Sequence, residues 1–171
     1  MPTLFHRFYD LFSGGGEVTI LNMVTALPDW HHVLAFNRAR PTWLSDALQK
    51  QPNVELVQTK TEDVPALIDK HAPDIVLLHW YPPMNVGDVA DLPASVLERT
   101  VLYNQWFRPI PYLSGLKKVV FVTPWLERTF GSDYAADMRA VVINPVRDVF
   151  FDIEVDQSGP PSVGRHARPV G

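Results

Sequence analysis

Short apolar runs alternate with amphipathic helical patterns along most of the chain. Near-continuous apolar or β-branched runs, typical of strands buried in a parallel sheet, occur at 4–8, 31–36, 54–57, 74–78, 100–103, 119–122 and 140–143. Helical spacing and helix-start residues lie between them, at 18–27, 41–48, 61–68, 90–98 and 124–130. This alternation predicts right-handed crossovers, so the expected fold class is α/β: a three-layer, Rossmann-like domain with a mainly parallel sheet.

Three glycines separate the first expected strand from the first expected helix. Gly14, Gly15 and Gly16 follow Ser13 and precede Glu17. A glycine run is costly in backbone entropy, and a turn of this kind directs unpaired N–H groups and the helix dipole at one point, which suits an anion or a sugar hydroxyl. The alternative is a tight turn in which the glycines only let the helix pack on the sheet. These residues alone leave both interpretations open.

Length and charge limit the architecture and the partners. The chain has 171 residues, enough for one well-buried α/β domain and short for two. A formal net charge of −4 with scattered Lys and Arg argues against a nucleic-acid partner. The chain contains no Cys, which is compatible with a reducing compartment, so a cytoplasmic location is expected. No apolar run approaches the ~20 residues of a membrane span, which leaves peripheral membrane contact open.

Polar and aromatic residues follow the expected strands. Ligands of open α/β sheets bind beyond the carboxyl ends of the strands, so these positions are the candidates for function. His79 follows the fourth strand and could donate a hydrogen bond to a sugar hydroxyl or a phosphate, while Trp80 and Tyr81 could form a stacking wall. The alternatives are a histidine satisfied at a strand end and aromatic residues that belong to the core.

The fifth and sixth strands are also followed by polar residues. Asn104 ends the fifth strand, and Arg108 is the cation of the loop after it, where a guanidinium could bind phosphate bidentately. A solvated loop arginine is the alternative for Arg108. Thr123 follows the sixth strand, and its expected role is to cap the next helix.

Several kinds of site have no support in the sequence. We find no pair of catalytic carboxylates, no cluster at metal-ligand spacing and no Gly-x-Ser-x-Gly elbow, so neither a hydrolase nor a metalloenzyme is indicated. The pair His31-His32 lacks partners at ligand spacing and is expected at the surface. We therefore expect no metal.

The order of these features resembles the amino-terminal half of GT-B glycosyltransferases. The features are a strand and a Gly-Gly-Gly-Glu loop, then Asp74-Ile-Val-Leu-Leu-His79, Thr100-Val-Leu-Tyr-Asn104, Phe121-Val-Thr-Pro, Val142-Ile-Asn144-Pro-Val-Arg-Asp148 and Val163-Gly164-Arg165. The closest group is the retaining family that includes bacterial phosphatidylinositol mannosyltransferases and sucrose-phosphate synthases. The resemblance implies two facing Rossmann-like domains: the amino-terminal one supplies the acceptor site and the glycine loop, and the carboxy-terminal one binds the nucleotide-sugar.

The resemblance also implies site residues and domain limits. Gly15 and Gly16 would approach the donor phosphates or the acceptor, His79 would line the cleft, and Arg165 matches a phosphate-contacting arginine of the second domain. Asn104 stands where the family often has a sugar-contacting histidine, so an amide would make that contact. The expected domains are 1–151 for the acceptor side, 152–161 for a linker and 162–171 for the truncated start of a donor-binding domain.

The expected function is that of the acceptor-binding domain of a retaining glycosyltransferase, inactive without its missing carboxy-terminal domain. Its expected partners are a nucleotide-sugar donor, a sugar, lipid or small-molecule acceptor, and that second domain. The nucleotide-sugar would be a co-substrate, and no cofactor is expected. The exposed cleft face is expected to promote self-association. The rival hypothesis is a non-catalytic small-ligand or phosphate-binding domain of Rossmann type.

Overall fold

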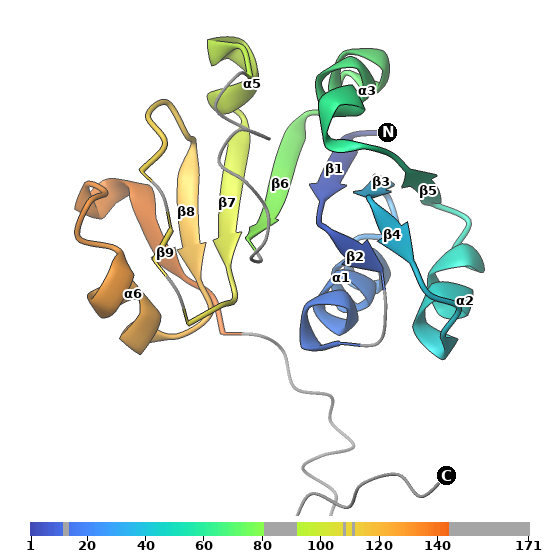
Figure 1. The fold of residues 1–171 in the computed structure, drawn as a ribbon, viewed down its shortest axis with the longest axis horizontal. Coiled ribbons are helices and arrows are strands. Elements are labelled where there is room, and N and C mark those ends of the chain that lie inside the picture. The colour runs from blue at the N-terminus through green and yellow to red at the C-terminus, as the bar shows by residue number, and fades with distance from the viewer. Residues whose placement is uncertain (12–13, 81–91, 108, 111, 144–171) are drawn as a thin grey trace, which may run out of the picture.

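A seven-stranded parallel sheet organises the chain in this computed structural model, which describes residues 1–11, 14–80, 92–107, 109–110 and 112–143. The strands follow the order β5-β3-β1-β6-β7-β8-β9, and every neighbouring pair is parallel. Their bounds are Thr3–Arg7 for β1, His31–Phe36 for β3, Val54–Gln58 for β5, Ile75–Trp80 for β6, Thr100–Asn104 for β7, Lys118–Phe121 for β8 and Arg139–Val141 for β9. In Figure 1, β1, β6, β7 and β8 lie side by side with their arrowheads toward the same end.

Helices cover both faces of this sheet. One face packs against α1 (Gly15–Ala26) and α2 (Trp43–Gln49) through a core that includes Phe8, Ile20 and Leu44. The other face packs against the remaining helices through a core that includes Phe5, Ile68 and Leu126. These helices are α3 (Val64–His71), α5 (Ala94–Leu97) and α6 (Pro124–Phe130), and the 3-10 turns η1 and η2 span Thr61–Asp63 and Ala136–Met138. The predicted three-layer α/β fold is confirmed.

The ends of several elements differ from the sequence-based expectation. The strand predicted at 74–78 continues to Trp80, so His79 lies within β6 and is buried. The helix predicted from Pro41 begins after Thr42, which caps it in a reciprocal capping box with Ser45. The helix predicted at 90–98 is four residues long in the part that is described, and 81–91 lie outside the described residues.

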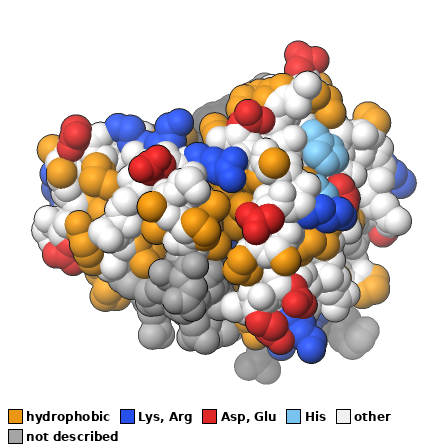
Figure 2. All heavy atoms as spheres, turned by 90° about the horizontal axis from the view of Figure 1, so that it is seen from above, with side chains coloured by type: hydrophobic (Ala, Val, Ile, Leu, Met, Phe, Trp, Pro, Cys, Tyr) orange, Lys and Arg blue, Asp and Glu red, His pale blue; other side chains and the backbone are white. Residues whose placement is uncertain are grey.

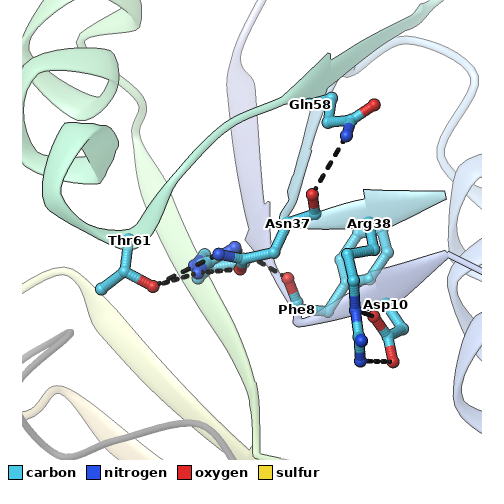
Figure 3. A network of polar contacts seen from close by, with 7 residues as sticks. Phe8, Asp10, Asn37, Arg38, Gln58 and Thr61 are labelled. Carbon is cyan, nitrogen blue, oxygen red and sulfur yellow. Dashed lines mark hydrogen bonds and ion pairs between the residues drawn. The ribbon is translucent and has the colours of Figure 1, made fainter.

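A small second sheet was not predicted. β2 (Asp10–Leu11) and β4 (Arg38–Ala39) pair in parallel just beyond the carboxyl ends of β1 and β3. Figure 3 shows the Arg38 guanidinium facing the Asp10 carboxylate, which accepts hydrogen bonds from Nε at 2.8 Å and from Nη2 at 3.0 Å. This two-stranded ribbon of β2 and β4 therefore fixes the position of Asp10 next to the glycine loop.

A buried arginine fixes the end of β1. Arg7 is 1% exposed, and its guanidinium donates to the carbonyl oxygen of Phe8 at 2.8 Å and to Oγ1 of Thr61 at 3.2 Å. It also donates to Oδ1 of Asn37, and in Figure 3 Asn37 and Thr61 point toward the same group. Because a buried guanidinium must keep its hydrogen bonds, this network holds the end of β1 against the segments that follow β3 and β5.

The carboxy-terminal segment lies outside the described residues. This applies to 144–171, and therefore to the predicted linker at 152–161, the predicted start of a second domain at 162–171, and Arg165. The domain limits stay predictions. Within the described part of the chain, no helix has the length and apolar character needed to cross a membrane.

Candidate functional site

A cavity of about 410 Å³ lies at the carboxyl ends of β1 and β6, where α1 begins. It is lined by residues 8–10, the glycine loop at 14–17, Ile20, His79 and Trp80 of β6, and Gln105 and Trp106 after β7. Its volume is in the range of small-molecule sites. The sequence predicted that the ends of these three strands meet at one crevice, and this is confirmed, although Gln105 and Trp106 line the cavity in place of Asn104.

The glycine loop presents backbone donors to this cavity. Gly14 is the N-cap of α1 and, as a glycine, has no side chain with which to cap the helix. Its carbonyl oxygen accepts the first helical hydrogen bond, from the N–H of Val18 at 3.1 Å. In the part of the chain that the structure describes, the N–H groups of Gly15 and Gly16 meet no acceptor. They lie at the positive end of a twelve-residue helix, which favours an oxygen ligand.

The space in front of Gly15 is open. A Cβ atom built on Gly15 meets no heavy atom within 4 Å, whereas one on Gly16 lies 2.9 Å from Oε1 of Gln105. Of the described glycines, Gly115 alone has a positive φ. Neither packing nor backbone conformation therefore requires glycine at position 15.

Two carboxylates lie at the rim of the cavity. Asp10 is paired with Arg38. Burial raises the pKa of the Glu17 carboxyl, and the nearby Asp10 adds to the rise, while backbone N–H groups of Glu17 and Gly14 counteract it. The described lining contains no Lys or Arg, and Arg108 lies outside the described residues. This lining, with two carboxyl groups and no cation among its described residues, disfavours a phosphate group and can accept hydrogen bonds from hydroxyl groups.

Three buried imidazoles, which we call the histidine file, run diagonally across β6, β1 and β3. Nε2 of His79 lies 3.1 Å from Nδ1 of His6, and Nε2 of His6 lies 3.0 Å from Nδ1 of His32. Nε2 of His32 lies 3.2 Å from the carbonyl oxygen of Leu27, the C-cap of α1. The rings of His6 stack on both neighbours, with centroids 5.3 and 5.4 Å apart. His32 is fully buried, so the expectation that His31-His32 is a surface pair was wrong for His32.

The hydrogen bond to the carbonyl oxygen of Leu27 determines which nitrogen of each imidazole in the histidine file carries the proton. A carbonyl oxygen only accepts, so His32 carries its proton on Nε2 and accepts on Nδ1. His6 must then donate from Nε2 and accept on Nδ1, and His79 must donate from Nε2. This assignment, which follows from the hydrogen-bond network, leaves Nδ1 of His79 as an acceptor.

The file is uncharged at neutral pH. Burial lowers the pKa of His79 to about 3, and burial together with the other two imidazoles lowers the pKa of His6 well below its usual value. Burial also lowers the pKa of His32, against the hydrogen bond to Leu27. A neutral His79 whose Nδ1 accepts differs from the donor that the sequence suggested. It can receive a hydrogen bond from a hydroxyl group and offers none to a phosphate.

Side chains that line the cavity carry buried polar atoms with no hydrogen-bond partner among the described residues. These atoms are Nδ1 of His79, Nε1 of Trp80 and Nε2 of Gln105, and Nδ2 of the adjacent Asn104 is also without one. Oδ1 of Asn104 accepts from the N–H of Trp106 at 3.0 Å, which shapes the turn after β7. An unsatisfied buried polar group costs about 1–3 kcal/mol, so such a cluster calls for a ligand or ordered water.

Two further groups complete the comparison with the sequence. Thr123 accepts from the N–H of Leu126 at 3.1 Å, which confirms its predicted capping role.

At the opposite end of the sheet, the structure brings together His31, Glu55 and His71, whose ligand atoms all lie within 4.8 Å of one another. This group could not be predicted from the sequence, because its members are separated by 24 and 16 positions. The pairing of β3 with β5 brings His31 and Glu55 together, and the packing of α3 on the sheet adds His71.

The fold is similar to that of a solved glycosyltransferase from Rickettsia africae ESF-5. The similarity has a TM-score of 0.62 and covers 88% of this chain and 45% of that chain, with 16% sequence identity. This chain thus corresponds to less than half of that structure. Comparison with protein-family models and with curated proteins gave no match. The likeness shows a Rossmann-like α/β fold of the kind found in a glycosyltransferase.

Proposed function

We propose that this chain is the acceptor-side domain of a GT-B glycosyltransferase that uses a nucleotide-sugar donor. Three observations support the proposal: the fold is similar to that of a glycosyltransferase, the chain covers less than half of that structure, and its cavity lies at the carboxyl ends of parallel strands. The retaining mode and the nucleotide-sugar dependence rest on the resemblance of the sequence motifs.

The chemistry of the cavity carries the proposal. Among the described residues, those that line it carry one free acceptor, Nδ1 of His79, and free donors in Nε1 of Trp80, Nε2 of Gln105 and the N–H groups of Gly15 and Gly16. A hydroxyl group both donates and accepts, whereas a fully deprotonated phosphate group only accepts. A hydroxyl-rich substrate such as a sugar or a cyclitol can therefore pair with both the free hydrogen-bond acceptor and the free donors.

A second domain would cover apolar surface near the cavity. Phe107 and Trp125, which follow β7 and β8, are 70% and 49% exposed, and their ring centroids are 5.9 Å apart. Val142 and Ile143 beyond β9 are also exposed. Large apolar side chains grouped at one end of a sheet are typical of a surface that meets a partner. Transfer needs contacts that stabilise the leaving pyrophosphate, and in this proposal the second domain supplies them.

The test is a binding experiment with a panel of ligands. Neutral monosaccharides and cyclitols, inorganic phosphate and nucleoside diphosphates are titrated into the chain while tryptophan fluorescence is recorded, because Trp80 and Trp106 line the cavity. We expect at least one neutral polyol to bind and phosphate not to displace it. Binding of phosphate or nucleotide alone would instead favour a non-catalytic phosphate-binding domain. Sugar transfer is expected only from a longer chain that carries the second domain.

A further inference from the structure

His31, Glu55 and His71 form a polar group at the end of the sheet away from the cavity. Nε2 of His31 lies 3.6 Å from Oε2 of Glu55, and Nε2 of His71 lies 3.8 Å from Oε1 of the same carboxylate. Glu55 pairs with Val33, whose side chain lies on the face of the sheet that α3 covers. Side chains alternate along β3, so His31 lies on the same face. The third member, His71, is the last residue of α3. Figure 2, which views this end of the molecule, shows histidine side chains at the surface next to an acidic one.

One of these imidazoles has a buried nitrogen that lacks a hydrogen bond in the part of the chain that the structure describes. The side chain of His71 is 10% exposed, and its Nε2 atom is shielded from solvent without a hydrogen-bond partner there. This atom faces the Glu55 carboxylate at more than hydrogen-bond distance. The other two side chains are 29% and 41% exposed, so an ion can reach the group from solvent.

We propose that His31, Glu55 and His71 bind a divalent transition-metal ion, and that zinc suits their donor set best. Two imidazole nitrogens are borderline ligands that favour zinc over magnesium or calcium, and zinc also accepts a carboxylate oxygen. Bonds of about 2.0–2.1 Å to a tetrahedral ion place its ligand atoms about 3.3 Å apart. With either carboxylate oxygen as the ligand, the pair that it forms at 3.6 or 3.8 Å needs a shift of only a few tenths of an ångström. The other two pairs lie within 4.8 Å and need larger shifts.

The ion would join three elements that are otherwise held by packing and by strand pairing. His31 begins β3, Glu55 lies in the edge strand β5, and His71 ends α3. Three protein ligands leave the fourth position for water. An alternative interpretation of the group is a pair of ion pairs between the two imidazoles and the Glu55 carboxylate, which needs protonated imidazoles. A metal ion binds neutral imidazoles instead, so metal affinity must rise with pH.

The experiment uses the chain without a polyhistidine tag, freed of metal with a chelator. Zinc chloride is titrated by calorimetry at pH 7.5 and 6.0, and Co²⁺ is titrated by its visible absorption. We expect one ion per chain, tighter binding at pH 7.5, and a rise in melting temperature of about 5 °C or more at 100-fold excess over the dissociation constant. Glu55→Gln is expected to weaken binding at least tenfold.

The control variant is Glu62→Gln, which changes an exposed carboxylate outside the group and is expected to bind zinc as the unmodified chain does. His31→Gln provides a second test at a half-exposed position, so that the outcome does not depend on the more buried His71. The proposal is overturned if no saturable binding occurs, or if Glu55→Gln and His31→Gln both bind with unchanged affinity, because the ion would then lie elsewhere in the chain.

Discussion

Substitution of Gly15 by valine separates the two roles that a glycine loop can have. If the glycine serves only a packing turn, a side chain there collides with the protein or strains the backbone. The structure shows neither, since a Cβ atom at this position meets nothing within 4 Å and φ is not positive. If the glycine keeps space for a ligand, the valine side chain occupies that space.

The expected magnitudes differ for stability and for binding. In a helix interior, glycine and valine cost about 1 and 0.6 kcal/mol relative to alanine. Gly15 is the first residue of α1, where such differences are not larger, so Gly15→Val is expected to change the free energy of unfolding by only a few tenths of a kcal/mol. Binding loses a backbone hydrogen bond, about 0.5–1.5 kcal/mol, and the volume that the side chain fills. A loss of about 1.4 kcal/mol or more is a tenfold or greater rise in the dissociation constant.

The assay measures thermal melting and affinity for the tightest-binding sugar of the titration panel. Gly15→Val is compared with Ala26→Val, which adds the same branched side chain at the far end of α1, outside the cavity. Gly16→Val is less informative, because its Cβ displaces Gln105 and thereby alters the cavity wall as well. Unchanged affinity in Gly15→Val, with a normal melting transition, would refute the ligand role of the loop.

Three further predictions concern stability and association. Burial lowers the pKa of His6 and His79 in the folded chain, so the unfolded chain takes up protons that the folded chain does not as pH falls through 6.5. The free energy of unfolding at pH 5.5 should be lower than at pH 7.5 by about 1.4 kcal/mol from His79 alone. His6 adds to this loss, so His6→Gln should reduce the slope. Thr123→Ala should cost about 1 kcal/mol in denaturant unfolding and Thr123→Ser almost nothing. Light scattering should show association of the chain at high concentration that Phe107→Ser reduces; a chain that stays monomeric would contradict this.

The fold could be predicted because its strands are buried on both faces and therefore read as apolar runs. The run at 31–36 matches β3 at both ends, and the helix at 124–130 matches α6. The ribbon of β2 and β4 could not be predicted, because two residues per strand carry no periodicity. The Asp10 carboxylate was missed for the same reason, since only this ribbon and Arg38 hold it at the cavity.

The candidate site was predicted in part. The glycine loop and the end of β6 were found because a strand, a turn and a helix follow one another directly in the chain. The histidine file was not found, since contacts between His6, His32 and His79 depend on strand order and on a two-residue diagonal offset. A usable signal was present: each of these histidines interrupts or borders an apolar run, and a polar residue in a buried strand needs a partner.

Helix α1 links the two parts of the site through its opposite ends. Its first turn provides the N–H groups of Gly15 and Gly16, and the carbonyl oxygen of its C-cap, Leu27, fixes the proton of His32. Because each imidazole in the file is neutral and can donate only once, that distant carbonyl determines that Nδ1 of His79 accepts. The cavity thus receives donors from one end of the helix and an acceptor whose state is set at the other end. A charged histidine, which would attract phosphate, is excluded by the burial of the whole file.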